Sequence, residues 1–171
     1  MRIELDKLEG QGGRFAHTYE PDELVLDDEH ARLVEPPQVS VRIRRSGHEV
    51  RLEGQIRARA EVDCDRCLKQ VSVPVETTFE VTYVPASDYL EGDVAELHEE
   101  DLGVSVYEDE VIDMDELVRE QVLLTLPTRA LCTEDCKGLC PVCGTNRNEN
   151  DCECEPREAD PRWGALKDIK F

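Results

Sequence analysis

Apolar and polar residues alternate along three consecutive stretches between residues 39 and 83. The first stretch ends at Ser46–Gly47, a dipeptide typical of a hairpin turn, and the second runs into Cys64. Gly54 occupies one apolar slot and predicts a bulge there. A period of two residues predicts an antiparallel sheet with one buried face. The expected inward residues are Val39, Val41, Ile43, Val50, Leu52, Ile56, Ala58, Ala60, Val62, Val71, Val73, Val75, Thr77, Phe79, Val81 and Tyr83.

Helical spacing replaces this alternation from residue 113 to residue 126. Asp113 suits the N-cap, and Glu116 stands at the third helical position of a capping box. Pro127 ends the helix. The apolar stripe that should pack on the sheet consists of Met114, Leu117, Val118, Val122 and Leu124. A second, short helix is expected from Asp160–Pro161, because Pro is favoured at the first helical position.

The organisation of the chain follows from these elements. Residues 1–38 carry weak patterning and are expected to be an N-terminal extension that could contribute an edge strand, and Pro36–Pro37 is expected to mark the entry to the sheet. Residues 39–127 form a β-rich core with an acidic insert at 86–111, expected to be a long loop, and the helix at 113–126. Residues 128–171 form a Cys-rich segment that ends in the short helix.

Charge is distributed unevenly over the 171 residues, whose formal net charge is −20. From Gln70 to Val118 there are 15 Asp and Glu and no Lys or Arg. Nucleic-acid affinity depends on cations, so any RNA contact needs a local basic patch. The acidic surface also suits a basic protein partner, or solubility alone.

The outward positions of the predicted sheet supply a basic patch of this kind. It consists of Arg42, Arg44, Arg51, Arg57 and Arg59, interrupted by Glu53 and Glu61. An exposed strand face with many arginines is commonly just solvated, and that alternative stays open. In so acidic a chain, these five arginines are the candidate residues for RNA contact.

The eight cysteines indicate metal binding. The chain starts without an apolar leader and has no apolar run of the ~18 residues that span a membrane. We therefore expect a cytoplasmic protein with reduced thiols. Cys64 and Cys67 lie at the tip of a predicted hairpin, and the other six cysteines follow within 23 residues. The preferred pairing places one structural Zn²⁺ on Cys140, Cys143, Cys152 and Cys154, and a second on Cys64, Cys67, Cys132 and Cys136.

Other kinds of cysteine chemistry fit less well. A disulfide framework conflicts with a reducing compartment, and the spacing matches neither ferredoxin pattern. A redox C-x-x-C needs a helix N-terminus, which the pattern after Cys67 does not predict.

The predicted elements together define the fold class as α+β: an antiparallel sheet, one or two packed helices, and a small zinc-binding Cys-rich segment. The number of zinc ions, one or two, stays open.

Several motifs together resemble a known family. They are Cys64-Asp-Arg-Cys67-Leu68, Ile112-Asp113-Met114, Leu124-Thr-Leu-Pro127, the run C-K-G-L-C-P-V-C-G-T-N from Cys136, and Asp160-Pro161-Arg162. They resemble the YceD family, the large ribosomal RNA subunit accumulation proteins, over roughly residues 40–169. The resemblance implies a non-enzymatic factor that 23S rRNA needs in order to accumulate. By analogy, the cysteines would be the metal ligands.

Three functional hypotheses follow. In the first, zinc stabilises the fold and the arginines contact the RNA of a pre-ribosomal large-subunit particle. In the second, the acidic segment escorts a basic, zinc-containing ribosomal protein without direct RNA contact. The third is an enzyme, which the absence of any His among the cysteines and of a nucleophile–base pattern disfavours. Neither a membrane nor a small-molecule substrate is expected as a partner.

Overall fold

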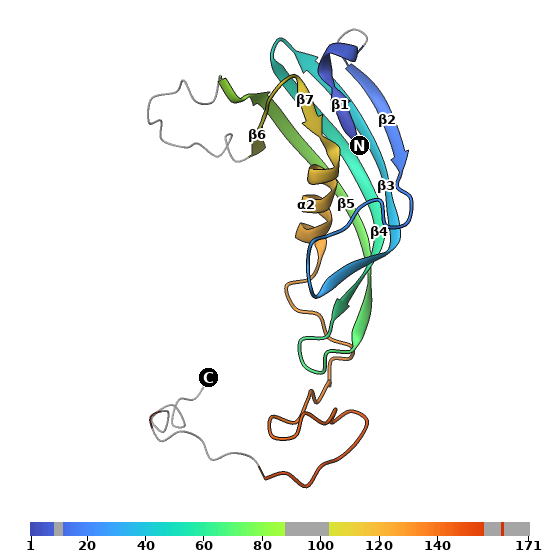
Figure 1. Cartoon of the computed structure of the whole chain (residues 1–171), viewed down its shortest axis with the longest axis vertical. Helices are drawn as coiled ribbons and strands as arrows, with labels where there is room; N and C mark the ends of the chain where they lie inside the picture. Colours follow the sequence, from blue (N-terminus) through green and yellow to red (C-terminus); the bar gives the residue numbers. More distant parts are fainter. Residues whose placement is uncertain (9–11, 88–102, 156–161, 163–171) are drawn as a thin grey trace. The chain divides into compact units, whose positions relative to one another are not determined.

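A computed structural model describes residues 1–8, 12–87, 103–155 and 162 (Figure 1). The chain divides into two compact units. Unit 1 comprises Met1–Val62 and Ser72–Thr128, and unit 2 comprises Asp63–Val71 and Arg129–Phe171. Within the described residues, no helix is both long and apolar enough to cross a membrane. The short helix expected at Asp160–Pro161 lies outside the described residues.

A five-stranded sheet forms most of unit 1. Its strands, in spatial order, are β2 (Gly12–Thr18), β3 (Ala31–Ser46), β4 (Glu49–Asp63), β5 (Gln70–Pro85) and β6 (Val104–Tyr107). Strand β3 is antiparallel to β2 and to β4, whereas β6 is parallel to β5. The prediction of a wholly antiparallel sheet was therefore wrong at this edge. The connection between β5 and β6 spans residues 86–103, and a parallel pair needs about a dozen residues or more to cross over.

The core lies on the face that the alternating pattern predicted. Val39, Val41 and Ile43 of β3 are at most 4% exposed, and Val50, Leu52 and Ile56 of β4 are fully buried. On β5, Val75, Phe79 and Tyr83 are buried, while the other expected positions are half-buried. The turn at Ser46–Gly47 is also confirmed, because Ser46 pairs with Glu49 across it.

Gly54 makes room for an aromatic ring and does not mark a bulge. The register runs without a break from Ser40↔Gln55 through Val41↔Gly54. A Cβ added at Gly54 would lie 2.5 Å from Cζ of Phe79 and 2.7 Å from the carbonyl oxygen of Ser40. The missing side chain therefore lets the Phe79 ring lie against the sheet, which explains a glycine in an apolar slot.

The ladder irregularities lie instead near Pro36–Pro37. The pairing of β3 with β4 shifts between Leu33 and Glu35 and again between Glu35 and Gln38. Proline has no N–H to donate, so it is tolerated in a strand at such breaks. Strand β3 nevertheless continues through both prolines, so they do not mark the entry to the sheet. Strand β2, at the sheet edge, also belongs to the first 38 residues.

The predicted helix is α2 (Met114–Thr125), which follows β7 (Val111–Asp113) directly. Met114, Leu117, Val118 and Val122 are buried in the same core as the sheet residues, as predicted. Leu124 does not belong to this stripe, because it is 72% exposed. The same core cluster contains Val75, Phe79 and Tyr83 of β5.

Part of the acidic stretch forms strands and not the expected loop. Strand β6 and the first residue of β7 both lie within residues 86–111. Tyr107 of β6 is buried, whereas Val106 is 46% exposed, so the apolar pattern of this short strand does not follow its buried face. Residues 88–102 of this stretch lie outside the described residues.

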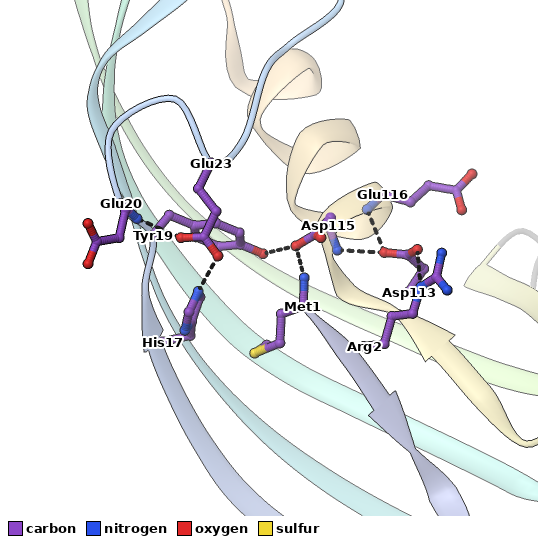
Figure 2. Close-up of polar contacts among 9 residues, drawn as sticks. All are labelled: Met1, Arg2, His17, Tyr19, Glu20, Glu23, Asp113, Asp115 and Glu116. Carbon is purple, nitrogen blue, oxygen red and sulfur yellow. Dashed lines mark hydrogen bonds and ion pairs between the residues drawn. The ribbon is translucent and has the colours of Figure 1, made fainter.

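A small two-stranded sheet and a polar network position the start of α2. Strand β1 (Arg2–Glu4) pairs antiparallel with β7 and leads into the 3₁₀ turn η1 (Leu5–Lys7). The Asp113 side chain accepts hydrogen bonds from the backbone N–H groups of Asp115 and Glu116, as its N-cap role requires. The network appears in Figure 2.

Asp115 is the centre of this network. Its Oδ1 accepts a hydrogen bond from the hydroxyl of Tyr19 at 2.7 Å and forms an ion pair with the amino group of Met1 (Figure 2). Burial and donation to Asp115 raise the pKa of the Tyr19 phenol well above its usual value. Because an ionised phenol could not donate, the hydroxyl stays protonated and stabilises the carboxylate.

The contact at Gly54 gives a stability prediction. We expect Gly54→Ala to lower the free energy of unfolding by about 1–3 kcal/mol, because the added methyl overpacks the Phe79 site. Urea denaturation of the full chain would measure it. Gly103→Ala is the control, because no atom lies within 4 Å of the added Cβ. Equal stability of both variants would contradict the close approach of Phe79.

Candidate metal centres and nucleic-acid interface

The first cysteine cluster is built on the short connection between β4 and β5. The N–H of Leu68 donates to the carbonyl of Cys64 at 2.9 Å, and the N–H of Cys64 donates to the carbonyl of Lys69 at 2.9 Å. Leu68 has a positive φ of 60°, which closes the turn. The turn directs the buried side chains of Cys64 and Cys67 to one side.

Backbone hydrogen bonds bring a distant segment of unit 2 onto this turn. Asp65 N–H donates to the carbonyl of Ala130, and Leu139 N–H donates to the carbonyl of Arg66, both at 2.9 Å. The Arg66 guanidinium donates to the carbonyl of Cys136 at 2.6 Å. Gly138, with φ +73°, permits this approach, because a Cβ there would lie 2.9 Å from the Arg66 oxygen.

The sulfur atoms of this cluster have the spacing of a metal site. The Sγ atoms of Cys64 and Cys136 are 3.8 Å apart, and those of Cys67 and Cys132 are 3.6 Å apart. A tetrahedron with metal–sulfur distances of about 2.3 Å has edges of about 3.8 Å. All four sulfurs lie within 4.8 Å of one another. The four-cysteine geometry therefore fits a tetrahedral metal ion.

Hydrogen bonds to sulfur favour the thiolate that a metal requires. Burial raises the pKa of Cys64, but N–H groups of neighbouring residues, chiefly Cys132, bring it down to about 6. The sequence did not predict a role for Asn148 at this cluster. Its Nδ2 lies 3.3 Å from the Sγ of Cys136, and its Oδ1 accepts a hydrogen bond from the N–H of Lys137. Outer contacts of this kind orient metal ligands. The N-x-N run after the last C-x-x-C was the only sequence hint.

The four thiols cannot all ionise unaided. The backbone N–H of Lys69 lowers the pKa of Cys67, but burial and the other three thiols raise it to about 12. Adjacent thiolates repel one another, so a cation is needed to hold all four deprotonated. All four thiols can therefore be deprotonated together when a positive ion lies between them.

The second cluster comprises Cys140, Cys143, Cys152 and Cys154, again with all sulfurs within 4.8 Å of one another. Gly144, with φ +75°, donates its N–H to the Cys140 carbonyl at 2.9 Å and so closes a tight loop. The side chain and N–H of Thr145 hold the pKa of Cys143 at about 6. Cys143 is exposed, whereas Cys64, Cys67 and Cys136 of the first cluster are buried.

The structure thus brings all eight cysteines into the two groups that we had paired from spacing. Both groups can hold a metal ion through sulfur alone. A set of four thiolates closes the coordination sphere, which is typical of structural sites. Within the described residues, strand β5 and no helix follows Cys67. The helix N-terminus that activates redox C-x-x-C pairs is therefore missing there.

The five candidate arginines lie on the outer face of unit 1. Cross-strand partners share a face, and Arg42 pairs with Glu53 while Arg44 pairs with Arg51. The register adds Arg14 of β2, directly opposite Arg42. Arg14 was not among the predicted residues, because the apolar and polar pattern of β2 is too weak to assign Arg14 to a face. We call Arg14, Arg42, Arg44, Arg51, Arg57 and Arg59 the arginine face.

Half of the arginine face is engaged in ion pairs within the sheet. Arg44 lies 3.4 Å from Glu53, Arg51 lies 3.5 Å from Glu80, and Arg59 donates to Glu35 at 2.9 Å. Arg14, Arg42 and Arg57 form no ion pair with any residue that the structure describes. Arg14 and Arg42 are neighbours of like charge, which destabilises a sheet unless an anion lies between them.

A β-sheet protein with two four-cysteine clusters is the class that these features define. The chain belongs to the family described as "Large ribosomal RNA subunit accumulation protein YceD", whose model matches residues 52–170. This confirms the resemblance that the motifs indicated. No solved structure matches the chain.

Relatives of the chain occur in plants and bacteria. The chain is 28% identical over 159 residues to the chloroplastic "Large ribosomal RNA subunit accumulation protein YCED homolog 1" of Arabidopsis thaliana, covering 79% of this chain and 49% of the plant protein. It is 27% identical over 168 residues to protein YlbN of Bacillus subtilis, covering 97% and 92%. It is 30% identical over 151 residues to an uncharacterized protein of Mycobacterium tuberculosis, covering 86% and 66%. The chain therefore spans about half the length of the plant relative.

The difference in exposure between the clusters gives a prediction on metal loss. We expect two equivalents of a thiophilic divalent metal by native mass spectrometry, lost to a chelator in two phases. The cluster with exposed Cys143 should lose its ion first, because chelator and water reach it directly. Cys143→Ser should abolish the fast phase, and Cys136→Ser the slow one. A single phase, or less than one equivalent in reduced protein, would contradict this.

Proposed function

We propose that this protein is a non-enzymatic factor of large ribosomal subunit assembly, on which the accumulation of 23S rRNA depends. Two structural zinc ions, one on each cysteine cluster, stabilise unit 2. The arginine face contacts the RNA of the pre-ribosomal particle. The proposed factor acts in the cytoplasm, because the eight cysteine thiols stay reduced in that compartment. The division at residue 127, between the β-rich core and the Cys-rich segment, is part of this proposal.

The proposed RNA contact rests on the position of the arginine face. In a chain of net charge −20, cations gather on one face of one sheet. Arg14, Arg42 and Arg57 keep their guanidinium groups free of ion pairs within the described residues. Arginine binds phosphate oxygens through two parallel hydrogen bonds. Membership of the YceD family supports a role in large-subunit assembly, because the plant relatives are named for the accumulation of large-subunit ribosomal RNA.

Zinc is the proposed ion because of the donor set. Sulfur-only tetrahedra select zinc or iron–sulfur clusters among the common metals, and the cysteine spacing matches no ferredoxin pattern. Bound zinc contributes roughly 10–16 kcal/mol of apparent binding energy in small domains. Among its described residues, unit 2 has a small apolar cluster around Val71, Leu131 and Leu139, so we propose that it depends on that contribution.

A second candidate function rests on the acidic segment. Seven Asp and Glu fall within residues 88–102, and a run of this charge can bind a basic protein. The alternative is therefore an escort of a basic, zinc-containing ribosomal protein that makes no direct RNA contact.

Depletion of the protein from its host tests the process. We expect the ratio of 23S to 16S rRNA to fall selectively, with large-subunit precursors on a sucrose gradient. Re-expression of the natural chain should restore the ratio. An unchanged ratio after complete depletion would show that the chain does not act in large-subunit assembly.

Charge reversal tests the arginine face. Arg42→Glu and Arg57→Glu should each weaken association with pre-ribosomal RNA by about tenfold or more, because a charge-assisted phosphate contact is lost. Arg129→Glu, an exposed arginine of unit 2, applies the same charge change away from the face and should have little effect. Filter binding at several salt concentrations measures all three.

Co-sedimentation with the pre-ribosomal particle separates the two candidate functions. Undiminished association of Arg42→Glu, combined with loss on changing the seven acids of residues 88–102 to amides, would replace RNA contact by the escort function. This design leaves β6 intact, whereas a deletion that extends to residue 110 would remove a strand of the sheet.

A further inference from the structure

A hollow of about 500 Å³ lies on the outer side of β2, β3 and β4. Two small side chains lie at its centre, because Ala16 of β2 lies opposite Ser40 of β3. Ser40 in turn lies opposite Gln55 of β4. The neighbouring rows carry longer side chains, with Arg14, Arg42 and Glu53 on one side, where Glu53 is paired with Arg44. The hollow forms where the row of long side chains is followed, along the strands, by a row with shorter ones.

The hollow continues toward a third arginine. A smaller space of about 210 Å³ shares Ala16, Ser40 and Gln55 with the first and extends to Gln38 and Arg57. Gln38 lies opposite Arg57 in the register. The rows of Arg42 and Arg57 are thus four residues apart along β3, or about 13 Å. The floor of the hollow therefore lies between Arg42 at one end and Arg57 at the other.

The chemistry of the walls suits a nucleobase. The hydroxyl of Ser40 and the amides of Gln55 and Gln38 each donate and accept hydrogen bonds, as base edges require. The backbone groups beneath are paired in the ladder and leave recognition to these side chains. The volume lies within the range of ~300–1,000 Å³ typical of sites for small ligands.

A paired base cannot enter such a space. Duplex RNA keeps its bases stacked, and proteins bind it by shape, phosphate and 2′-hydroxyl contacts. An unpaired nucleotide can turn its base into a hollow while neighbouring phosphates bind cations. Cations at both ends, with a small polar floor between them, match the second arrangement.

We infer that the hollow over Ala16, Ser40 and Gln55 binds an unpaired nucleobase of RNA. Arg14 and Arg42 bind a phosphate on one side of that nucleotide, and Arg57 binds a phosphate on the other. This inference rests on the proposed RNA contact of the arginine face. It extends that contact from general charge attraction to a preference for single-stranded RNA.

The test compares two forms of one RNA. Binding of the full, metal-loaded chain to a labelled ten-nucleotide RNA is measured by fluorescence anisotropy, with the same strand also presented as a duplex. We expect at least tenfold tighter binding of the single strand. Ala16→Leu should fill the hollow, weaken single-strand binding by about tenfold, and leave duplex binding unchanged. Thr78→Leu, at an exposed position of β5, is the matched control and should change neither.

The outcomes separate this inference from the proposed function. Equal binding of both RNA forms, unaffected by Ala16→Leu but lost in Arg42→Glu, would overturn the inference and leave the arginine face in place. Absence of binding to either form by the natural chain would overturn both. A loss of both forms in Ala16→Leu, with unchanged circular dichroism, would also overturn the base site, because filling the hollow should spare the duplex.

Discussion

The register that joins β2, β3 and β4 decides which side chains reach the core and which reach solvent. Because side chains alternate along a strand, a slip of one residue would exchange the two faces completely. In the observed register, Val41 lies opposite Gly54 and Ile43 opposite Leu52. The same register aligns Arg14 with Arg42 on the other face. The hydrophobic core and the arginine face are thus two consequences of one strand pairing.

Unit 2 follows a different physical rule. Its described buried side chains are chiefly cysteines, and few large apolar groups surround them. Hydrophobic burial alone is a weak basis for so small a unit. Backbone hydrogen bonds from the turn at Cys64–Lys69 to Ala130 and Leu139 position the sulfurs. The proposed zinc ions would then supply the cross-links that the apolar contacts do not.

The separation of charge connects this architecture to the proposed role. The acids of residues 70–118 keep the chain strongly negative, which suppresses unspecific attraction to nucleic acid. The arginine face concentrates cations on one rigid sheet, partly held by Glu35, Glu53 and Glu80. The negative chain as a whole repels RNA, whereas the arginine face attracts it. This combination favours binding of RNA at one defined surface over unspecific binding.

Local pattern alone determined much of the molecule. The period of two residues placed Val39, Val50 and Phe79 in the core, and the cap at Asp113 placed α2. These features depend on neighbours in sequence, so the sequence contains them. Cysteine spacing likewise suggested the two groups of sulfurs, although their role as metal ligands stays a prediction.

Tertiary structure alone decided the features that depend on distant pairing. These include the parallel addition of β6, the passage of β3 through Pro36–Pro37, and the placement of Arg14 beside Arg42. The contact of Gly54 with the Phe79 ring belongs to the same group. Each requires two segments far apart in the chain to meet in a particular register, and neither segment alone carries that information. The hollow over Ala16 and Ser40 exists for the same reason, because its floor is assembled from separate strands.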